Sequence, residues 1–153
     1  MRIERSIELP CDPDEAWRVL VDWERQADWM ADADAIVVTS SQRAGTGITL
    51  RVRTRLFGIP AFTETIEVID WEPPKALTIA HGPPLRGRGT WTLERTLERT
   101  QAGTRFTWAE EVELETPALG WLISAAYAPV LGWLLRRSMR GLRASIIARG
   151  PAG

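Results

Sequence analysis

The sequence predicts an α+β domain, in which a curved antiparallel sheet of about seven strands wraps around a long C-terminal helix and two short helices lie between the first two strands. Two patterns indicate this class. Apolar and polar residues alternate in short runs over residues 34–115, as in strands that bury one face. Over residues 117–149 the apolar residues recur at helical spacing instead. At 153 residues the chain has the length of one domain, so we expect residues 1–149 to form it and residues 150–153 to be frayed.

A strand and two short helices open the chain. Residues 2–9 place apolar side chains at period two, which indicates a strand. Asp12 before Pro13 is typical of a helix start, because an acid caps the first free N–H groups and proline suits the first helical position. A second short helix, with Trp23 and Trp29 on it, is expected over about 22–30.

Further strands follow at hairpin spacing, with turns that contain glycine or proline between most of them. They are expected over residues 34–39, 48–56, 62–68, 76–81, 86–98 and 104–115, with a turn at 101–103. Such spacing favours an antiparallel sheet with one polar face. Arg51, Arg53 and Arg55 have the parity opposite to Ile48, so we expect them on the solvent face, paired with acids such as Glu67.

The last helix is the element that must cover the apolar face of the sheet. Thr116 and Pro117 suit its N-cap and first position, and Pro129 should kink or break it. Residues 116–135 carry no charge and are numerous enough to span a bilayer. Because the sheet needs this helix, a buried helix with cations at its C-terminal end is favoured. Peripheral membrane contact and a true span remain the alternatives.

Composition excludes several classes of protein. One cysteine and one histidine exclude an internal disulfide and His-rich metal centres, so no metal and no cofactor are expected. The net charge of −1 does not indicate a nucleic-acid-binding protein, so no nucleic-acid partner is expected, although residues 116–153 hold five arginines and no acid. Met1 leads directly into charged residues, so the cytoplasm is the expected compartment. The eight tryptophans suit a filled core or an aromatic-lined cavity, with core filling favoured.

Several segments carry a resemblance to a known superfamily. They run from the opening strand with residues 10–17, through the Asp-Trp pairs at 22–23 and 28–29, to residues 71–77, 89–93, 103–108 and 134–140. In this order the chain resembles the helix-grip fold of the START-like (Bet v 1-like, SRPBCC) superfamily, and most closely its bacterial polyketide cyclase/dehydrase and lipid-transport group. That superfamily includes aromatase/cyclases, hydrolases, hormone receptors and lipid carriers, so the resemblance specifies the fold far better than the function.

Three polar residues fall where the alternation predicts an inward side chain. Glu64 lies between Phe62 and Ile66, Glu110 lies between Trp108 and Val112, and His81 shares the parity of Leu77 and Ile79. A carboxylate on an apolar face is costly unless it is paired, neutral or wet, and a water-filled cavity meets that need. The competing interpretation is that a bulge or a strand end turns each group to solvent. A nucleophilic Cys11–His81 pair is disfavoured, because no basic neighbour activates the thiol.

The function predicted is binding of a hydrophobic or aromatic small molecule in an internal cavity. Its lining should include Trp29, Thr54, Phe62, Trp91, Trp108 and Tyr127. The resemblance implies a polyketide cyclase/dehydrase-like enzyme, with Glu64, Glu110 and His81 exchanging protons during aldol cyclisation and dehydration. Two alternatives stay open: a non-enzymatic lipid or isoprenoid carrier, and an interaction module that uses the basic C-terminal helix. A monomer or a homodimer is compatible with all of them.

Overall fold

The computed structural model describes residues 1–98, 101–115 and 119–150. Its strands form one antiparallel sheet in the order β1-β7-β6-β5-β4-β3-β2. The strands are β1 Arg2–Leu9, β2 Ala33–Val38, β3 Thr49–Leu56, β4 Ile59–Glu72, β5 Ala76–His81, β6 Leu85–Glu98 and β7 Gln101–Leu114. The helices are α1 Pro13–Leu20, the 3-10 helix η1 Trp23–Asp28 and α2 Gly120–Arg149. This is the predicted helix-grip arrangement.

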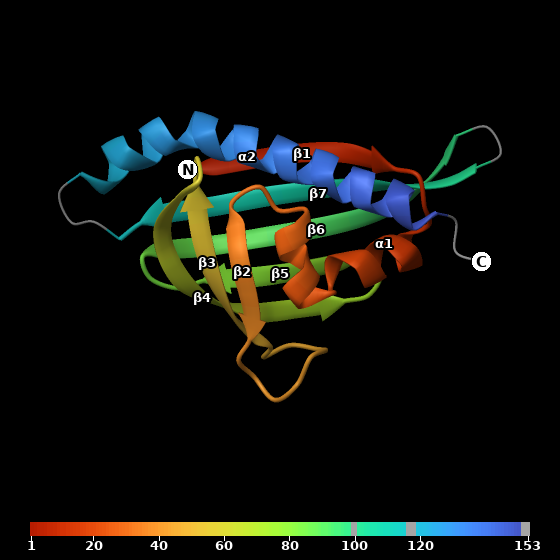
Figure 1. Cartoon of the computed structure of the whole chain (residues 1–153), viewed down its shortest axis with the longest axis horizontal. Coiled ribbons are helices and arrows are strands. Elements are labelled where there is room, and N and C mark those ends of the chain that lie inside the picture. Colours follow the sequence, from red (N-terminus) through yellow and green to blue (C-terminus); the bar gives the residue numbers. More distant parts are fainter. Residues whose placement is uncertain (99–100, 116–118, 151–153) are drawn as a thin grey trace.

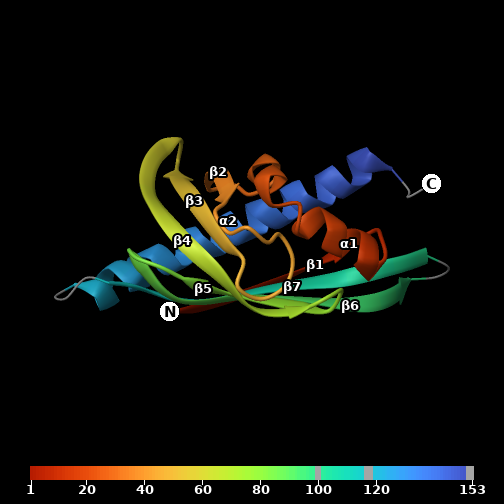
Figure 2. The same ribbon diagram turned by 90° about the horizontal axis from the view of Figure 1, so that it is seen from below.

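The long helix α2 lies along β1 and β7, while α1 and η1 cover the other part of the same face (Figure 1). The sheet curves so that β2, β3 and β4 rise on the side that holds all three helices (Figure 2). The space inside this curve is where the core and any cavity must lie.

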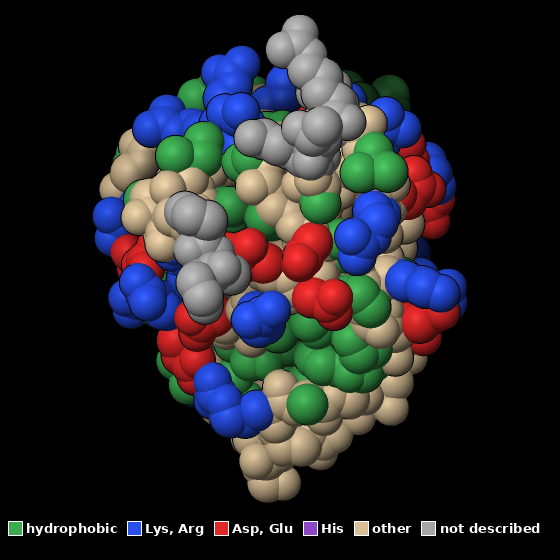
Figure 3. Space-filling model, turned by 90° about the vertical axis from the view of Figure 1, so that its right-hand side faces the viewer, with side chains coloured by type: hydrophobic (Ala, Val, Ile, Leu, Met, Phe, Trp, Pro, Cys, Tyr) green, Lys and Arg blue, Asp and Glu red, His purple; other side chains and the backbone are tan. Residues whose placement is uncertain are grey.

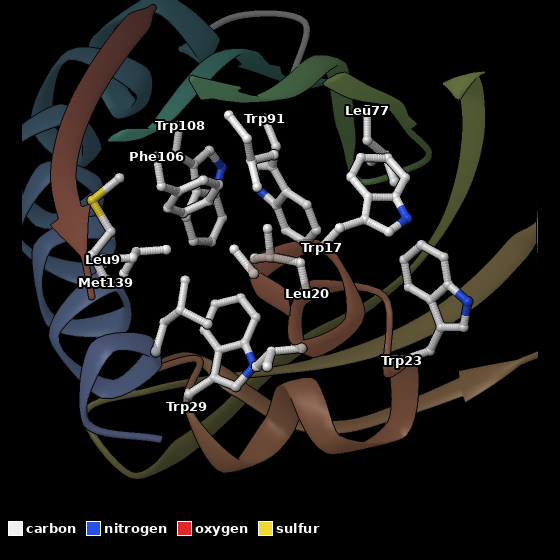
Figure 4. Close-up of a cluster of buried hydrophobic side chains, with 14 of the residues drawn as sticks. Leu9, Trp17, Leu20, Trp23, Trp29, Leu77, Trp91, Phe106, Trp108 and Met139 are labelled. Atoms are coloured by element: carbon white, nitrogen blue, oxygen red, sulfur yellow. The ribbon is translucent and has the colours of Figure 1, made fainter. Parts of the chain in front are cut away.

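The core is rich in tryptophan: five of the eight tryptophans are buried in it, and Trp71 packs against it. Trp17 and Trp23 both pack against Trp71. Trp29, Trp91 and Trp108 form a second group with Phe106 (Figure 4). Aromatic pairs of this kind contribute about 0.5–1.5 kcal/mol each beyond their burial.

The start of α1 follows the sequence prediction. Asp12 Oδ1 accepts a hydrogen bond from the Glu15 N–H at 2.9 Å, and Pro13 occupies the first helical position. The second predicted helix is η1, a shorter 3-10 helix.

Arg51, Arg53 and Arg55 are exposed on the outer face, as their parity predicts. The partner predicted for them is wrong. Arg53 and Arg55 both pair with Asp34, at 2.7 Å and 2.6 Å, whereas Glu67 stands opposite Thr49 in the β3–β4 ladder. Asp34 on β2 is the acid within reach because β2 closes the edge of the sheet beside β3.

Two local predictions also need correction. Residues 101–103 do not turn: they are the first residues of β7 and pair with residues 96–98 of β6. Helix α2 continues through Pro129 without the predicted break, and Ser124 before it and Leu131 after it are both buried. That packing offsets the hydrogen bond that proline cannot donate. The predicted cap, Thr116 with Pro117, lies outside the described residues.

None of the helices in the described part of the chain combines the length and the apolar character needed to cross a membrane.

Candidate functional site

A pocket of about 100 Å³ lies between the curved sheet and α2. Side chains from β2–β7, η1 and α2 line it, and most of them are apolar. The polar exceptions are Gln26, Asp32, Thr54, Glu64, His81, Glu110, Tyr127 and Ser138. An apolar pocket with a few convergent polar groups is the usual form of a small-molecule site.

Glu64, His81 and Glu110 meet in this pocket. His81 Nδ1 lies 3.0 Å from Glu64 Oε2, and His81 Nε2 lies 2.8 Å from Glu110 Oε2. All three side chains are at most 10% exposed. The imidazole therefore bridges two buried carboxylates.

Sheet register explains how residues from three strands come together. His81 ends β5 and stands opposite Ile66, so Glu64 is its diagonal neighbour on β4. Glu110 lies on β7, with β6 between it and β5. The β6 residues in the way are Gly87, opposite His81, and Gly89, opposite Glu110. Because neither glycine has a side chain, the imidazole reaches across β6 to the carboxylate.

The two glutamates differ in how fully they are bonded. Glu110 Oε1 accepts a hydrogen bond from Trp108 Nε1–H at 2.7 Å, so both of its oxygens are engaged. Within the described residues, Glu64 Oε1 accepts no hydrogen bond. Glu64 is therefore the carboxylate that is better placed to take a proton from a bound molecule.

The protonation of His81 follows from its two partners. Burial lowers its pKa, but the hydrogen bonds and the negative charges of Glu110 and Glu64 outweigh burial and raise the pKa to about 10. At neutral pH the ring is an imidazolium whose two N–H groups donate to the two carboxylates. It is a poor general base in this state.

Two further titratable groups face the same pocket. Burial raises the pKa of Asp32 to about 6, and the charges of Glu110 and Glu64 add to the shift. Burial also raises the pKa of the Tyr127 hydroxyl, with Asp32, Glu110 and Glu64 contributing. Sequence reasoning included Tyr127 but missed Asp32, which precedes β2 and a register shift between Ala33 and Ala35. Because Asp32 lies outside the alternating runs of the strands, the alternation does not predict the direction of its side chain.

Most of the predicted lining residues are in the pocket. Thr54, Phe62, Trp91, Trp108 and Tyr127 line it. Trp29 does not: its ring packs against those of Trp91 and Trp108, with centroids 6.2 Å and 6.4 Å away. Trp23, which was not among the predicted lining residues, does line the pocket.

Cys11 stands apart from this site. It is buried, does not line the pocket, and burial raises the pKa of its thiol to about 11. A thiol with that pKa is not an activated nucleophile. Both ring nitrogens of His81 instead contact Glu64 and Glu110, so the Cys11–His81 pair is not formed.

Comparison with known proteins identifies relatives of this architecture. The sequence pattern of the family described as polyketide cyclase/dehydrase and lipid transport matches residues 1–146. No curated protein sequence matches the chain.

Solved structures with the same arrangement share little sequence with it. A protein from Thermus thermophilus has a TM-score of 0.81 at 18% identity, with 98% of this chain and 99% of that one covered. The ZhuI aromatase/cyclase from Streptomyces sp. R1128 has a TM-score of 0.66 at 15% identity, with 97% and 92% covered. A START superfamily protein from Mycobacterium smegmatis has a TM-score of 0.63 at 12% identity, with 96% and 97% covered. At these identities the likeness shows the fold alone.

Proposed function

Because the chain belongs to the polyketide cyclase/dehydrase and lipid transport family, we propose that its pocket binds a hydrophobic or aromatic small molecule and acts on it as a polyketide cyclase/dehydrase-like enzyme. The observation that carries this proposal is the Glu64–His81–Glu110 bridge inside an otherwise apolar pocket.

Stability alone does not account for such a bridge. Replacing a buried ion pair with well-packed apolar residues is often neutral or stabilising by about 1–4 kcal/mol. Strongly perturbed titratable groups that gather in a pocket are instead typical of functional sites. The bridge therefore supports proton-transfer chemistry on a bound molecule.

The chemistry that fits is aldol cyclisation followed by loss of water. It needs a base that takes a proton from the carbon beside a carbonyl, and an acid that protonates the departing hydroxyl. Glu64, with its free Oε1, is the candidate base. Asp32 is the candidate acid, since a pKa of about 6 leaves roughly one Asp32 in ten protonated at pH 7. His81 and Glu110 are positioning residues that hold the Glu64 carboxylate.

A non-enzymatic carrier of a lipid or isoprenoid is the second candidate. The predominance of apolar side chains around the pocket favours it. The two candidates differ in one respect, because only the enzyme exchanges protons with the molecule that it holds.

The experiment uses 1-tetralone, an aromatic ketone whose α-protons exchange slowly in neutral buffer. Binding should quench tryptophan emission, because Trp91 and Trp108 line the pocket. In D₂O the wild-type protein should accelerate deuterium uptake at the α-carbon. Glu64→Gln should bind the ketone equally well without accelerating uptake, because an amide does not exchange a proton at neutral pH.

The matched control is Glu67→Gln, on the same strand but exposed on the outer face; it should behave as wild type. Binding without accelerated exchange in the wild-type protein would favour the carrier. Absence of binding by 1-tetralone and by larger apolar ligands would contradict both candidates.

A further inference from the structure

A group of large apolar side chains is exposed around the first half of α2. It comprises Leu119, Trp121, Leu122, Ile123 and Trp133 on or beside α2, with Phe57 and Ile59 at the β3–β4 turn. We call these seven residues the apolar rim. Trp121 is 74% exposed and Phe57 is 72% exposed. Exposed large apolar side chains that gather in one region are uncommon on a free surface and mark a site of interaction.

The rim joins two parts of the chain. The rings of Phe57 and Trp133 stack with their centroids 6.0 Å apart and their planes at 25°. The first turns of α2 extend past the ends of the strands (Figures 1 and 2). The rim is therefore a projecting surface rather than a groove.

Unpaired cations lie directly beside the rim. The Arg137 guanidinium lies 5.2 Å from the centre of the Trp133 ring, and Arg136, Arg137 and Arg140 surround a shallow depression next to that ring. Among the residues that the structure describes, none of these three arginines forms an ion pair. Residues 116–153 contain no acid at all.

Several arginines elsewhere on the molecule have acidic partners. On the outer face of the sheet, Arg2, Arg86 and Arg105 pair with glutamates of neighbouring strands. The end of the molecule that carries the C-terminus shows acidic and basic side chains interspersed (Figure 3). Arg136, Arg137 and Arg140, by contrast, gather beside the exposed Trp133 ring without an ion pair among the described residues.

We propose that the apolar rim and these three arginines dock the protein onto an anionic phospholipid bilayer. Trp121, Leu122 and Phe57 would enter the headgroup region, where tryptophan side chains are favoured, and the arginines would lie on the lipid phosphates. Exposed apolar side chains and basic side chains on one helix are the two features that such a surface recognises together.

The charge argues against a second copy of this chain as the occupant. A symmetric dimer contact through this part of α2 would bring the arginines of both copies together with no acid from α2 to balance them. The projecting shape likewise suits a soft bilayer surface better than a close fit to another protein.

Docking here would place the pocket next to the bilayer. Tyr127, Leu131 and Leu134 of the same helix line the pocket, as does Phe62 of β4. An apolar ligand could then pass between bilayer and pocket. The docking surface itself does not depend on what the pocket does with that ligand.

Vesicle co-sedimentation of the whole chain tests the proposal. Vesicles of phosphatidylcholine with phosphatidylglycerol should bind the protein, and vesicles of phosphatidylcholine alone should bind it far more weakly. The combined Arg136→Gln, Arg137→Gln and Arg140→Gln variant should lose about 100-fold in partitioning, at about tenfold per 1.4 kcal/mol. Trp121→Ser with Leu122→Ser should also lose binding, and added salt should weaken binding of the wild-type protein.

The matched control is Arg86→Gln with Arg88→Gln, two exposed arginines on β6, which should bind as wild type. Circular dichroism and the melting temperature establish that each variant is folded. Equal binding to neutral and anionic vesicles, or no binding to either, would overturn the proposal. So would a dimer in sedimentation equilibrium that Trp121→Ser converts to monomer, since the rim would then be covered by a second copy.

Discussion

Gly89 stands directly opposite Glu110 in the β6–β7 ladder, and the absence of a side chain at residue 89 leaves the space that the Glu110 carboxylate fills. A Cβ atom at residue 89 would lie 2.7 Å from Glu110 Oε1 and 2.9 Å from Oε2. The position of this one glycine is thus part of what holds Glu110 against His81.

Gly89→Ala should displace the Glu110 carboxylate and weaken its hydrogen bond to His81. The pKa of His81 should then fall towards its ordinary value, because the first of the two contacts that raise it is lost. Overpacking of this kind costs about 1–3 kcal/mol of stability. An NMR titration of the imidazole measures the pKa. Gly103→Ala, where the nearest atom to the new Cβ would be Thr96 Oγ1 at 2.9 Å, is the matched control and should leave His81 unchanged.

The stability of the protein should fall as the pH rises above neutral. The folded pKa of His81 is about 10 and its ordinary value is 6.5, so the folded state holds a proton that the unfolded state releases between these values. The stabilisation is fully present below about pH 6.5 and is lost as the pH approaches 10, with a slope of at most about 1.4 kcal/mol per pH unit. Urea denaturation at pH 7, 8 and 8.5 measures it. A His81→Gln variant should show a flatter dependence, and an equally steep one would contradict this account.

Ligand charge should decide affinity for the pocket. Glu64, Glu110 and Asp32 line it, and His81 is its one cation among the described residues. A buried anion added to this set has no unpaired cation to bind. We expect 2-naphthalenemethanol to bind at least about tenfold more tightly than 2-naphthoate, as measured by quenching of tryptophan emission. Asp32→Asn should reduce the difference. Tighter binding of 2-naphthoate than of 2-naphthalenemethanol would contradict the assignment of three acidic side chains and one cation to the pocket.

Glu110→Gln should preserve ligand binding, because the shape and apolar area of the pocket are kept. If the protein is an enzyme, the variant should lose turnover, since His81 loses one charged partner and the Glu64 carboxylate is held less firmly. If the protein is a carrier, ligand transfer should continue. Parallel assays of binding and of deuterium uptake by 1-tetralone separate these outcomes.

Arg53→Ala should change the free energy of unfolding by no more than about 1 kcal/mol, because exposed ion pairs contribute little and Asp34 keeps Arg55 as a partner. Thermal denaturation measures this. A loss above about 2 kcal/mol would mean that the arginine does more than pair on the outer face.

Alternation in the sequence was enough to orient Glu64 and Glu110, because period two decides which face of a strand a residue occupies. It could not show that His81 lies between them, since that depends on the register of four strands and on the two glycines of β6. Gly87 and Gly89 are two residues apart and therefore lie on the same face of β6. Two missing side chains on one face are the signal in the sequence that a side chain from a neighbouring strand lies across β6 at this point.

Other features lie beyond local patterns altogether. Asp32 precedes a strand that begins with a register shift, so no period assigns its direction. Pro129 was expected to kink or break the helix, but α2 runs on through it, with buried residues on both sides. Trp23 and Trp29 lie on or next to one short helix, yet Trp23 lines the pocket while Trp29 packs against Trp91 and Trp108, a difference set by tertiary packing.

The bridge of Glu64, His81 and Glu110 is the central claim, and one NMR titration tests it most directly. His81 is the only histidine of the chain, so the imidazole region of a ¹⁵N spectrum reports this residue alone. We predict that both ring nitrogens remain protonated from pH 6 to beyond pH 8.5, with a midpoint near pH 10. A midpoint near the ordinary 6.5, with a neutral ring at pH 8, would contradict the bridge and the proton chemistry proposed from it.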